Sequence, residues 1–241
     1  MTTLKNKVAL ITGGTKGIGY GIAERLLQEG VNVAVTSRTL QSAQEAAKRL
    51  NANSKTGAKA IGFQADVRNL KSQQDAVNAV EDVFGQLDVM VANAGIGHFA
   101  NIEDITEEQW QDTIDTNLTG VFNSIKASVN ALKKTKGYYL TISSLAGENF
   151  FANGSAYNAS KFGVTGFTQA VMLDLRQHGI KVSTIMPGSV ATHFNGHTPN
   201  DEDAWKIQSE DIGELVADLL KMNPRTLPSK IEVRPAMPPS K

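Results

Sequence analysis

The stretch Val8-Ala9-Leu10-Ile11-Thr12-Gly13-Gly14-Thr15-Lys16-Gly17-Ile18-Gly19 joins an apolar run to a glycine-rich turn. The run is typical of a parallel strand buried on both faces, and a helix is expected from about Gly17 to Gln28. Glycines let the backbone turn tightly and approach a pyrophosphate, and the first amides of a helix attract an anion. Although the spacing is Gly-x-x-x-Gly-x-Gly rather than Gly-x-Gly-x-x-Gly, its place between strand and helix predicts a dinucleotide site.

The rest of the chain alternates expected strands with expected helices. Further strands are expected at 31–36, 60–63, 87–92, 138–142, 181–185 and 230–233. The capping box Thr106-Glu107-Glu108-Gln109 predicts the start of a long helix that extends to about Lys133. Because short connections between strands and helices favour parallel βαβ units, we expect one α/β domain over residues 1–241. Its predicted core is a Rossmann-type, doubly wound, parallel seven-stranded sheet, followed by a proline-rich C-terminal tail at about 224–241.

Composition limits the class of protein. The chain has 241 residues, a formal net charge of zero and no cysteine. A neutral chain gives no reason to expect nucleic acid or an anionic membrane as a partner. Without cysteine there are no disulfides and no thiolate chemistry, and the spacing of the four histidines does not predict a metal site. The short polar stretch 1–7 and the lack of a bilayer-length apolar run lead us to expect a cytoplasmic protein.

Tyr157 and Lys161 stand four residues apart, and Ser144 lies thirteen residues before Tyr157. Residues i and i+4 share one face of a helix, so the phenol and the ammonium can point into one site. A nearby cation is expected to lower the pKa of the tyrosine from its usual value of about 10 and make it a usable general acid/base. With the nucleotide site, this predicts an enzyme that moves a hydride and a proton between a nicotinamide and a carbonyl/alcohol pair.

The residues after the second expected strand bear on the choice of cofactor. Sites for NAD often place an acid here, whereas this chain has Ser37-Arg38 and no acid between Glu29 and Glu45. A guanidinium can bind a 2′-phosphate through a forked pair of hydrogen bonds, and Lys16 could add a second cation. The sequence therefore predicts NADPH over NADH; the alternative is that both are solvated surface bases.

Several further motifs recur in a characteristic order. They are the 12–19 loop, Asp66, Asn93-Ala94-Gly95, Asn117, Ile142-Ser143-Ser144, Tyr157 with Lys161, and Pro187-Gly188. In this order, over nearly the whole chain, the sequence resembles the compact branch of the short-chain dehydrogenase/reductase family.

The resemblance implies a catalytic set of Asn117, Ser144, Tyr157 and Lys161. Tyr157 would donate a proton to the carbonyl oxygen, and Ser144 would hydrogen-bond that oxygen and fix its position. Lys161 would hold the ribose hydroxyls and lower the pKa of Tyr157, while Asn117 would support a water in a proton relay. Ser143 is the competing serine, and the thirteen-residue offset favours Ser144.

The resemblance also implies the contacts of the cofactor. Asn93 would brace the sheet and line the adenosine side, and Asp66 would contact adenine, with helix capping near Asn69 as its alternative. Thr192 would lie near the carboxamide. The predicted cofactor-binding residues are Gly13, Thr15, Lys16, Gly17, Ile18, Gly19, Ser37, Arg38, Asp66, Val67, Asn93, Ala94, Gly95, Tyr157, Lys161, Pro187, Gly188, Val190 and Thr192.

The predicted function is NADPH-dependent reduction of a ketone or aldehyde, with a small carbonyl or alcohol compound as substrate. The alternatives are a 3-oxoacyl-acyl-carrier-protein reductase, which the ending Ile231-Glu232-Val233-Arg234-Pro235 makes less typical, and a non-catalytic nucleotide-sensing protein. Phe99, Phe150 and Phe151 either line an apolar pocket or belong to a core or interface. The polar segment 193–203 is expected to be a loop that could close over substrate. By resemblance, a dimer or tetramer would form through helices 106–133 and 157–178, unless these helices only pack on the sheet.

Overall fold

A computed structural model describes residues 3–237 of the chain. Its centre is one seven-stranded, fully parallel sheet with the strand order β3-β2-β1-β4-β5-β6-β7. The strands are β1 (Val8–Ile11), β2 (Asn32–Ser37), β3 (Ala60–Gln64), β4 (Val89–Ala92), β5 (Tyr138–Ile142), β6 (Lys181–Pro187) and β7 (Lys230–Val233). The predicted fold is therefore confirmed, with strand limits that differ from the expected ones by a few residues at most.

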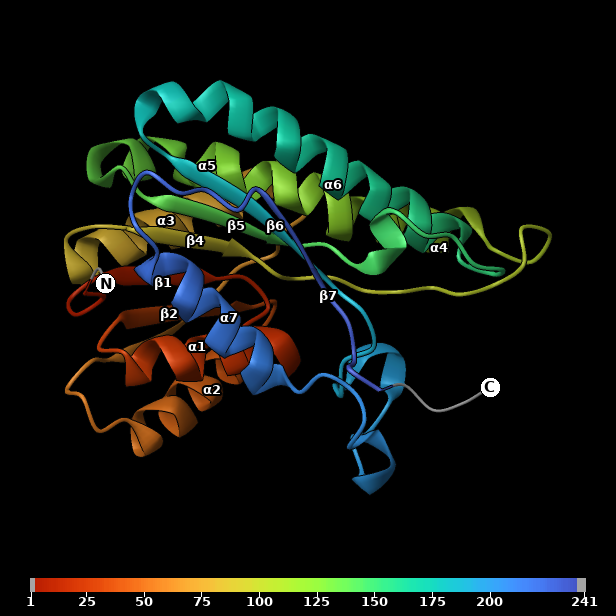
Figure 1. Cartoon of the computed structure of the whole chain (residues 1–241), viewed down its shortest axis with the longest axis horizontal. Coiled ribbons are helices and arrows are strands. Elements are labelled where there is room, and N and C mark those ends of the chain that lie inside the picture. Colours follow the sequence, from red (N-terminus) through yellow and green to blue (C-terminus); the bar gives the residue numbers. More distant parts are fainter. Residues whose placement is uncertain (1–2, 238–241) are drawn as a thin grey trace.

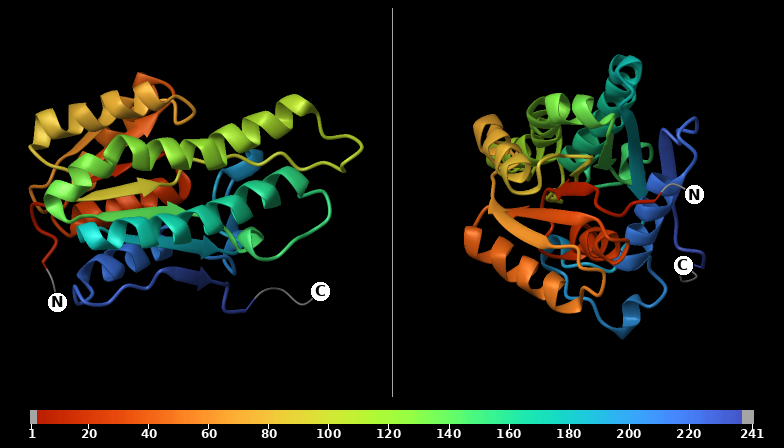
Figure 2. Two further views of the ribbon diagram at one scale, coloured as in Figure 1. Left: turned by 90° about the horizontal axis from the view of Figure 1, so that it is seen from above. Right: turned by 90° about the vertical axis from the view of Figure 1, so that its left-hand side faces the viewer.

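Helices cover both faces of the sheet (Figures 1 and 2). The helices are α1 (Gly17–Gln28), α2 (Leu40–Asn53), α3 (Leu70–Phe84), α4 (Glu107–Ile114), α5 (Gly120–Thr135), α6 (Ser155–Leu175) and α7 (Ser209–Lys221). α1, α2 and α7 lie on one face, where Ile22, Leu50 and Val216 belong to one buried apolar cluster. α3, α5 and α6 lie on the other, where Val80 and Ile125 belong to a second cluster. Burial of both faces explains why the central strands are continuous apolar runs.

The helix expected from Thr106 to about Lys133 is not uniform. Its capping box is present, because Gln109 N donates to Thr106 Oγ1 at 3.2 Å and Thr106 N donates to Gln109 Oε1 at 3.1 Å. Between α4 and α5, however, residues Asp115–Thr119 form a π-helical segment. In such segments each hydrogen bond spans one residue more than in an α-helix, and they occur frequently at functional sites. The buried Asn117 lies in this segment.

The loops that follow the strands gather at one end of the sheet, because all strands run the same way (Figure 1). The connection from β6 to α7, residues 188–208, extends beyond this end and contains two short 3₁₀ turns, Phe194–Gly196 and Asp201–Asp203. The buried Asp203 holds it together, since its carboxylate accepts from His197 Nε2 and Lys206 Nζ, each at 2.5 Å. These contacts, led by the hydrogen bond with His197, lower the pKa of Asp203 to about 2.

The structure also bears on membrane-spanning segments and on the proline-rich end of the chain. No helix among residues 3–237 combines the length and the apolar character that crossing a membrane would require. The expected proline-rich tail includes strand β7 and residues 234–237, which form neither helix nor strand. Pro238 and Pro239, which belong to the same prediction, lie outside the described residues.

Candidate active site

The glycine-rich loop between β1 and α1 forms a cradle of backbone. Gly13 and Gly17 adopt φ values of 63° and 56°, a left-handed conformation that favours glycine. A Cβ at Gly19 would lie 2.4 Å from Asn93 Nδ2, so a side chain has no room there. Lys16 caps α1 without a side-chain hydrogen bond to the helix, which leaves the first amides of α1 to face an anion. The residues present therefore fit the pyrophosphate of a dinucleotide.

Asn93 ties the end of β4 to this cradle. Its Nδ2 donates to Thr12 O at 2.9 Å and to Gly13 O at 3.2 Å. In return, Thr12 Oγ1 accepts the backbone amides of Asn93 and Ala94 at 3.0 and 3.1 Å. These four bonds join the two central strands β1 and β4, where the chain order of the sheet reverses. In open α/β sheets, ligands bind at this switch point.

The end of β6 faces the same space from the other side. A Cβ at Gly17 would lie 3.3 Å from the Thr192 side chain. Gly188 N donates to Val233 O at 2.8 Å, and Val190 pairs with Ile207 in an isolated parallel bridge. The backbone that leaves β6 is therefore held beside the glycine-rich loop.

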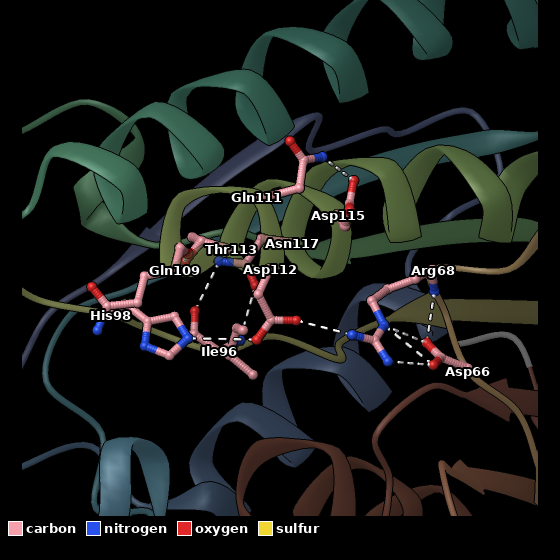
Figure 3. Close-up of polar contacts among 10 residues, drawn as sticks. All are labelled: Asp66, Arg68, Ile96, His98, Gln109, Gln111, Asp112, Thr113, Asp115 and Asn117. Carbon is pink, nitrogen blue, oxygen red and sulfur yellow. Dashed lines mark hydrogen bonds and ion pairs between the residues drawn. The ribbon is translucent and has the colours of Figure 1, made fainter. Parts of the chain in front are cut away.

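Asn117 and Lys161 meet beside Gly95, although they lie on different helical segments. A Cβ at Gly95 would lie 3.3 Å from Asn117 Oδ1 and 3.6 Å from Lys161 Nζ. The Asn117 side chain accepts from Ile96 N at 2.8 Å and donates to Ile96 O at 2.9 Å (Figure 3). It also donates to Ser160 Oγ at 3.0 Å. Its amide is thus engaged in positioning the loop after β4 against α6. The water relay beside Lys161 stays a prediction.

The two neighbouring serines at the end of β5 have different surroundings. Ser143 is buried; its hydroxyl donates to Lys161 O at 3.1 Å and bonds Thr165 Oγ1 at 3.0 Å. Ser144 is partly exposed; its hydroxyl donates to Pro187 O at 3.4 Å and accepts from Ala146 N at 3.1 Å, and it lies close enough to Tyr157 to influence the pKa of the phenol. Ser144 is therefore the serine that a ligand at Tyr157 would meet, whereas Ser143 packs α6 onto the sheet.

The pKa of Tyr157 departs from its usual value in the direction opposite to our prediction. Burial raises this pKa, and the neighbouring Ser144 hydroxyl offsets part of the rise. Lys161 Nζ lies 5.7 Å from the centre of the Tyr157 ring and donates to Ile142 O at 3.0 Å. Burial also lowers the pKa of Lys161 to about 8. The predicted lowering of the Tyr157 pKa is therefore wrong for this structure. The Lys161 ammonium faces the ring of Tyr157, and its own pKa is lowered, so it is deprotonated more easily.

The lowered pKa of Lys161 makes the stability of the fold depend on pH. Between pH 8 and pH 10.5 the unfolded chain keeps Lys161 protonated while the folded chain releases the proton, so the free energy of unfolding rises with pH. We expect the wild-type value minus the Lys161→Met value to rise by roughly 3 kcal/mol across this window. Denaturant unfolding at several pH values measures this difference, and a flat difference would contradict the assignment.

Arg38 and Lys16, the residues predicted to select the cofactor, are both exposed. Within residues 3–237 neither side chain has an ion-pair partner. Arg38 directly follows Ser37, the last residue of β2. Both cations are therefore free to meet a phosphate at the edge of the nucleotide site.

Arg68, which is not among the predicted site residues, links Asp66 to α4. Its Nε and Nη2 donate to the Asp66 carboxylate at 2.7–3.2 Å, and its Nη1 donates to Asp112 Oδ1 at 3.0 Å (Figure 3). The Arg68 guanidinium is the main cause that holds the pKa of Asp66 below its usual value, with a smaller contribution from Arg38. Asn69, not Asp66, caps α3, so the capping alternative for Asp66 is wrong. Val67, next in the chain, accepts a hydrogen bond from Asn123 Nδ2 through its carbonyl.

A parallel sheet with a glycine cradle at its switch point, and a Ser–Tyr–Lys cluster beside it, defines an α/β oxidoreductase. The family model described as short chain dehydrogenase matches residues 7–203. The chain belongs to this short-chain dehydrogenase/reductase family, whose members act on alcohol and ketone groups.

Three known proteins illustrate the similarity. Trans-4-hydroxycyclohexanecarboxylate dehydrogenase of Sinomonas cyclohexanicum is 36% identical over 220 residues, which cover 87% of this chain and 84% of that protein. A 3-oxoacyl-acyl-carrier-protein reductase of Vibrio cholerae is 35% identical over 213 residues, or 88% and 85% of the two chains. The structure of an alcohol dehydrogenase from Thermococcus sibiricus, complexed with 5-hydroxy-NADP, superposes with a TM-score of 0.89 at 28% identity, covering 98% of this chain and 99% of the other.

Proposed function

We propose that the protein is an NADPH-dependent reductase that converts a ketone or aldehyde reversibly into an alcohol. The observation that carries this proposal is the convergence of Ser144, Tyr157 and Lys161 at the edge of the sheet that holds the glycine cradle. When bound, the nicotinamide supplies the hydride; the chain's own residues orient the substrate and move the proton.

The proposed roles follow from the position of each group. Tyr157 donates its hydroxyl proton to the carbonyl oxygen; because burial raises its pKa, the phenol carries this proton at neutral pH. Ser144, whose hydroxyl lies beside Tyr157, donates to the same oxygen as negative charge develops there. Lys161 would hold the ribose hydroxyls, and Asn117 positions the loop after β4. Tyr157 and Ser144 would thus surround one oxygen atom.

NADPH is the proposed cofactor because Arg38 and Lys16 offer two exposed cations where a 2′-phosphate would lie. The related alcohol dehydrogenase structure contains a derivative of NADP, which supports the same choice. The remaining predicted contacts, Asp66 with adenine and Thr192 with the carboxamide, stay proposals. Asp66 would have to share its carboxylate with Arg68.

A 3-oxoacyl-acyl-carrier-protein reductase is the second candidate, favoured by the relative from Vibrio cholerae. The neutral charge of this chain and its ending beyond Val233 make a general carbonyl reductase the better-supported reading. A nucleotide sensor is a third class, and a sensor has no need of the Tyr157 and Ser144 pair.

The test is oxidation of NADPH, followed by absorbance, across small ketones, diketones, quinones and acyl thioesters, with NADH in parallel. We expect turnover with ketones or aldehydes and a preference for NADPH. Turnover of acyl thioesters alone would favour the acyl-carrier function. Binding of NADPH without oxidation by any carbonyl compound would overturn the proposal in favour of a sensor.

We also propose that the chain forms a homo-oligomer through α5 and α6. Phe122, Phe162 and Leu173 on these helices are 42–53% exposed. A Cβ at Gly166 would meet no atom within 4 Å, whereas one at Gly163 would lie 2.8 Å from Leu118 of the same chain. Gly163 thus serves packing within the chain, and Gly166 leaves room for a neighbour. Light scattering that reports a monomer would contradict this proposal.

A cytoplasmic location stays a prediction that cell fractionation would test.

A further inference from the structure

Three phenylalanines from three separate loops form one connected group beside the Tyr157 ring. Phe99 follows β4, Phe151 follows β5 and Phe194 follows β6. The Phe99 ring centre lies 6.0 Å from that of Phe151 and 6.3 Å from that of Phe194. The Tyr157 ring centre lies 5.3 Å from Phe99 and 5.7 Å from Phe194. We call Phe99, Phe151 and Phe194 the aromatic cluster.

The aromatic cluster belongs to neither buried core. Its members are 39%, 48% and 36% exposed, and none is part of the two apolar clusters that flank the sheet. Adjacent exposed rings are unfavourable in water unless they meet a ligand or a partner. Because two of these rings, Phe99 and Phe194, pack against the side chain that carries the proposed proton donor, the occupant that fits the cluster is the substrate.

Gly97 lets two of these rings close over the loop after β4. A Cβ at this position would lie 2.7 Å from Phe194 Cζ and 2.8 Å from Phe99 Cε2 and Cζ. The connection that carries Phe194 is in turn held by the contacts of Asp203 with His197 and Lys206. The positions of Phe99 and Phe194 therefore depend on specific contacts within the loop after β4 and the connection 188–208.

The rings are mutually tilted, with interplanar angles of 43°, 59°, 69° and 55° among the four pairs. Together they form a tilted aromatic surface beside Tyr157. A flat unsaturated ring packs well on such a surface, because aromatic pairs prefer offset or edge-to-face contacts at centre distances of about 4.5–7 Å. A saturated ring of equal size buries similar apolar area but lacks the charge distribution of an aromatic face and edge.

We propose that the aromatic cluster binds an aryl group of the substrate, so that the protein prefers carbonyl compounds whose C=O is attached to, or close to, an aromatic ring. This inference rests on the proposed function and names its substrate class. The carbonyl carbon takes the hydride as NADPH is oxidised, and the carbonyl oxygen takes the proton of Tyr157. The aryl ring contributes to binding and orientation, with no part in the chemistry.

The experiment compares kcat/KM for acetophenone and cyclohexyl methyl ketone, two ketones of matched size that differ in ring aromaticity. We expect the wild-type protein to prefer acetophenone at least about fivefold, since each aromatic contact contributes roughly two- to tenfold. Phe99→Leu and Phe151→Leu should each lower this preference by roughly two- to tenfold. Phe150→Leu is the matched control, because Phe150 is 86% exposed and, among the described residues, forms no ring pair.

The possible results distinguish the aryl assignment from the reductase function. Reduction of both ketones without preference for acetophenone would overturn the aryl assignment and leave the reductase function in place. An equal loss of preference in the Phe150→Leu control would also overturn it. Absence of carbonyl reduction altogether would overturn both. If the leucine variants do not fold, the inhibition constants of benzyl alcohol and cyclohexylmethanol for the wild-type protein are compared instead. The inference requires tighter inhibition by benzyl alcohol, and equal constants would overturn it.

Discussion

Replacing Tyr157 with phenylalanine should slow carbonyl reduction at least about 10²-fold, the lower end of what general acid/base catalysis contributes. The substitution removes only the hydroxyl that carries the proton. The ring remains, so its contacts with Phe99 and Phe194 should persist and the fold should be preserved. We expect the affinity for NADPH to stay within a few-fold of wild type. Single-turnover oxidation of NADPH and a fluorescence titration measure the two quantities separately.

Tyr20→Phe is the matched control for this prediction. Tyr20 lies on α1, where its ring packs under the Arg49 guanidinium at 5.4 Å, away from the Ser144 and Lys161 cluster. Its substitution should leave turnover unchanged. A purified Tyr157→Phe protein that reduces substrate at the wild-type rate would refute the role of Tyr157 as proton donor.

Arg38→Asp should move the cofactor preference from NADPH toward NADH. The substitution removes a guanidinium that can bind a 2′-phosphate and introduces a carboxylate that repels it, while a carboxylate there can accept hydrogen bonds from a ribose hydroxyl. Hydrogen bonds to charged groups contribute about 1.5–3 kcal/mol each, so we expect the ratio of kcat/KM for NADPH to that for NADH to fall by roughly 10- to 150-fold. Steady-state kinetics with both cofactors measure this ratio.

Arg225→Asp makes the same change of charge at another exposed arginine, between α7 and β7, and controls for the altered net charge. Its ratio should stay at the wild-type value. If the ratio in Arg38→Asp also stays unchanged, Arg38 is a solvated surface base and the preference for NADPH has lost its physical basis.

Much of the fold was predictable because its signals are local. The apolar run before Gly13 and strand β4 are buried on both faces of the sheet, and this burial leaves a continuous apolar pattern in the sequence. The capping box at Thr106 was found for the same reason, since its two hydrogen bonds join residues three positions apart. The π-helical segment around Asn117 has no comparable signal, because it depends on where α4 and α5 meet other elements.

The sequence by itself determined the parallel sheet, the glycine cradle and the spacing of Tyr157 and Lys161, since strand periodicity, backbone conformation at glycine and helical spacing act over a few residues. The tertiary structure alone decided the direction of the Tyr157 pKa, the bridge from Arg68 to Asp112 and the gathering of Phe99, Phe151 and Phe194. Each depends on burial or on distances between segments far apart in the chain, which the order of residues does not state and which only folding brings about.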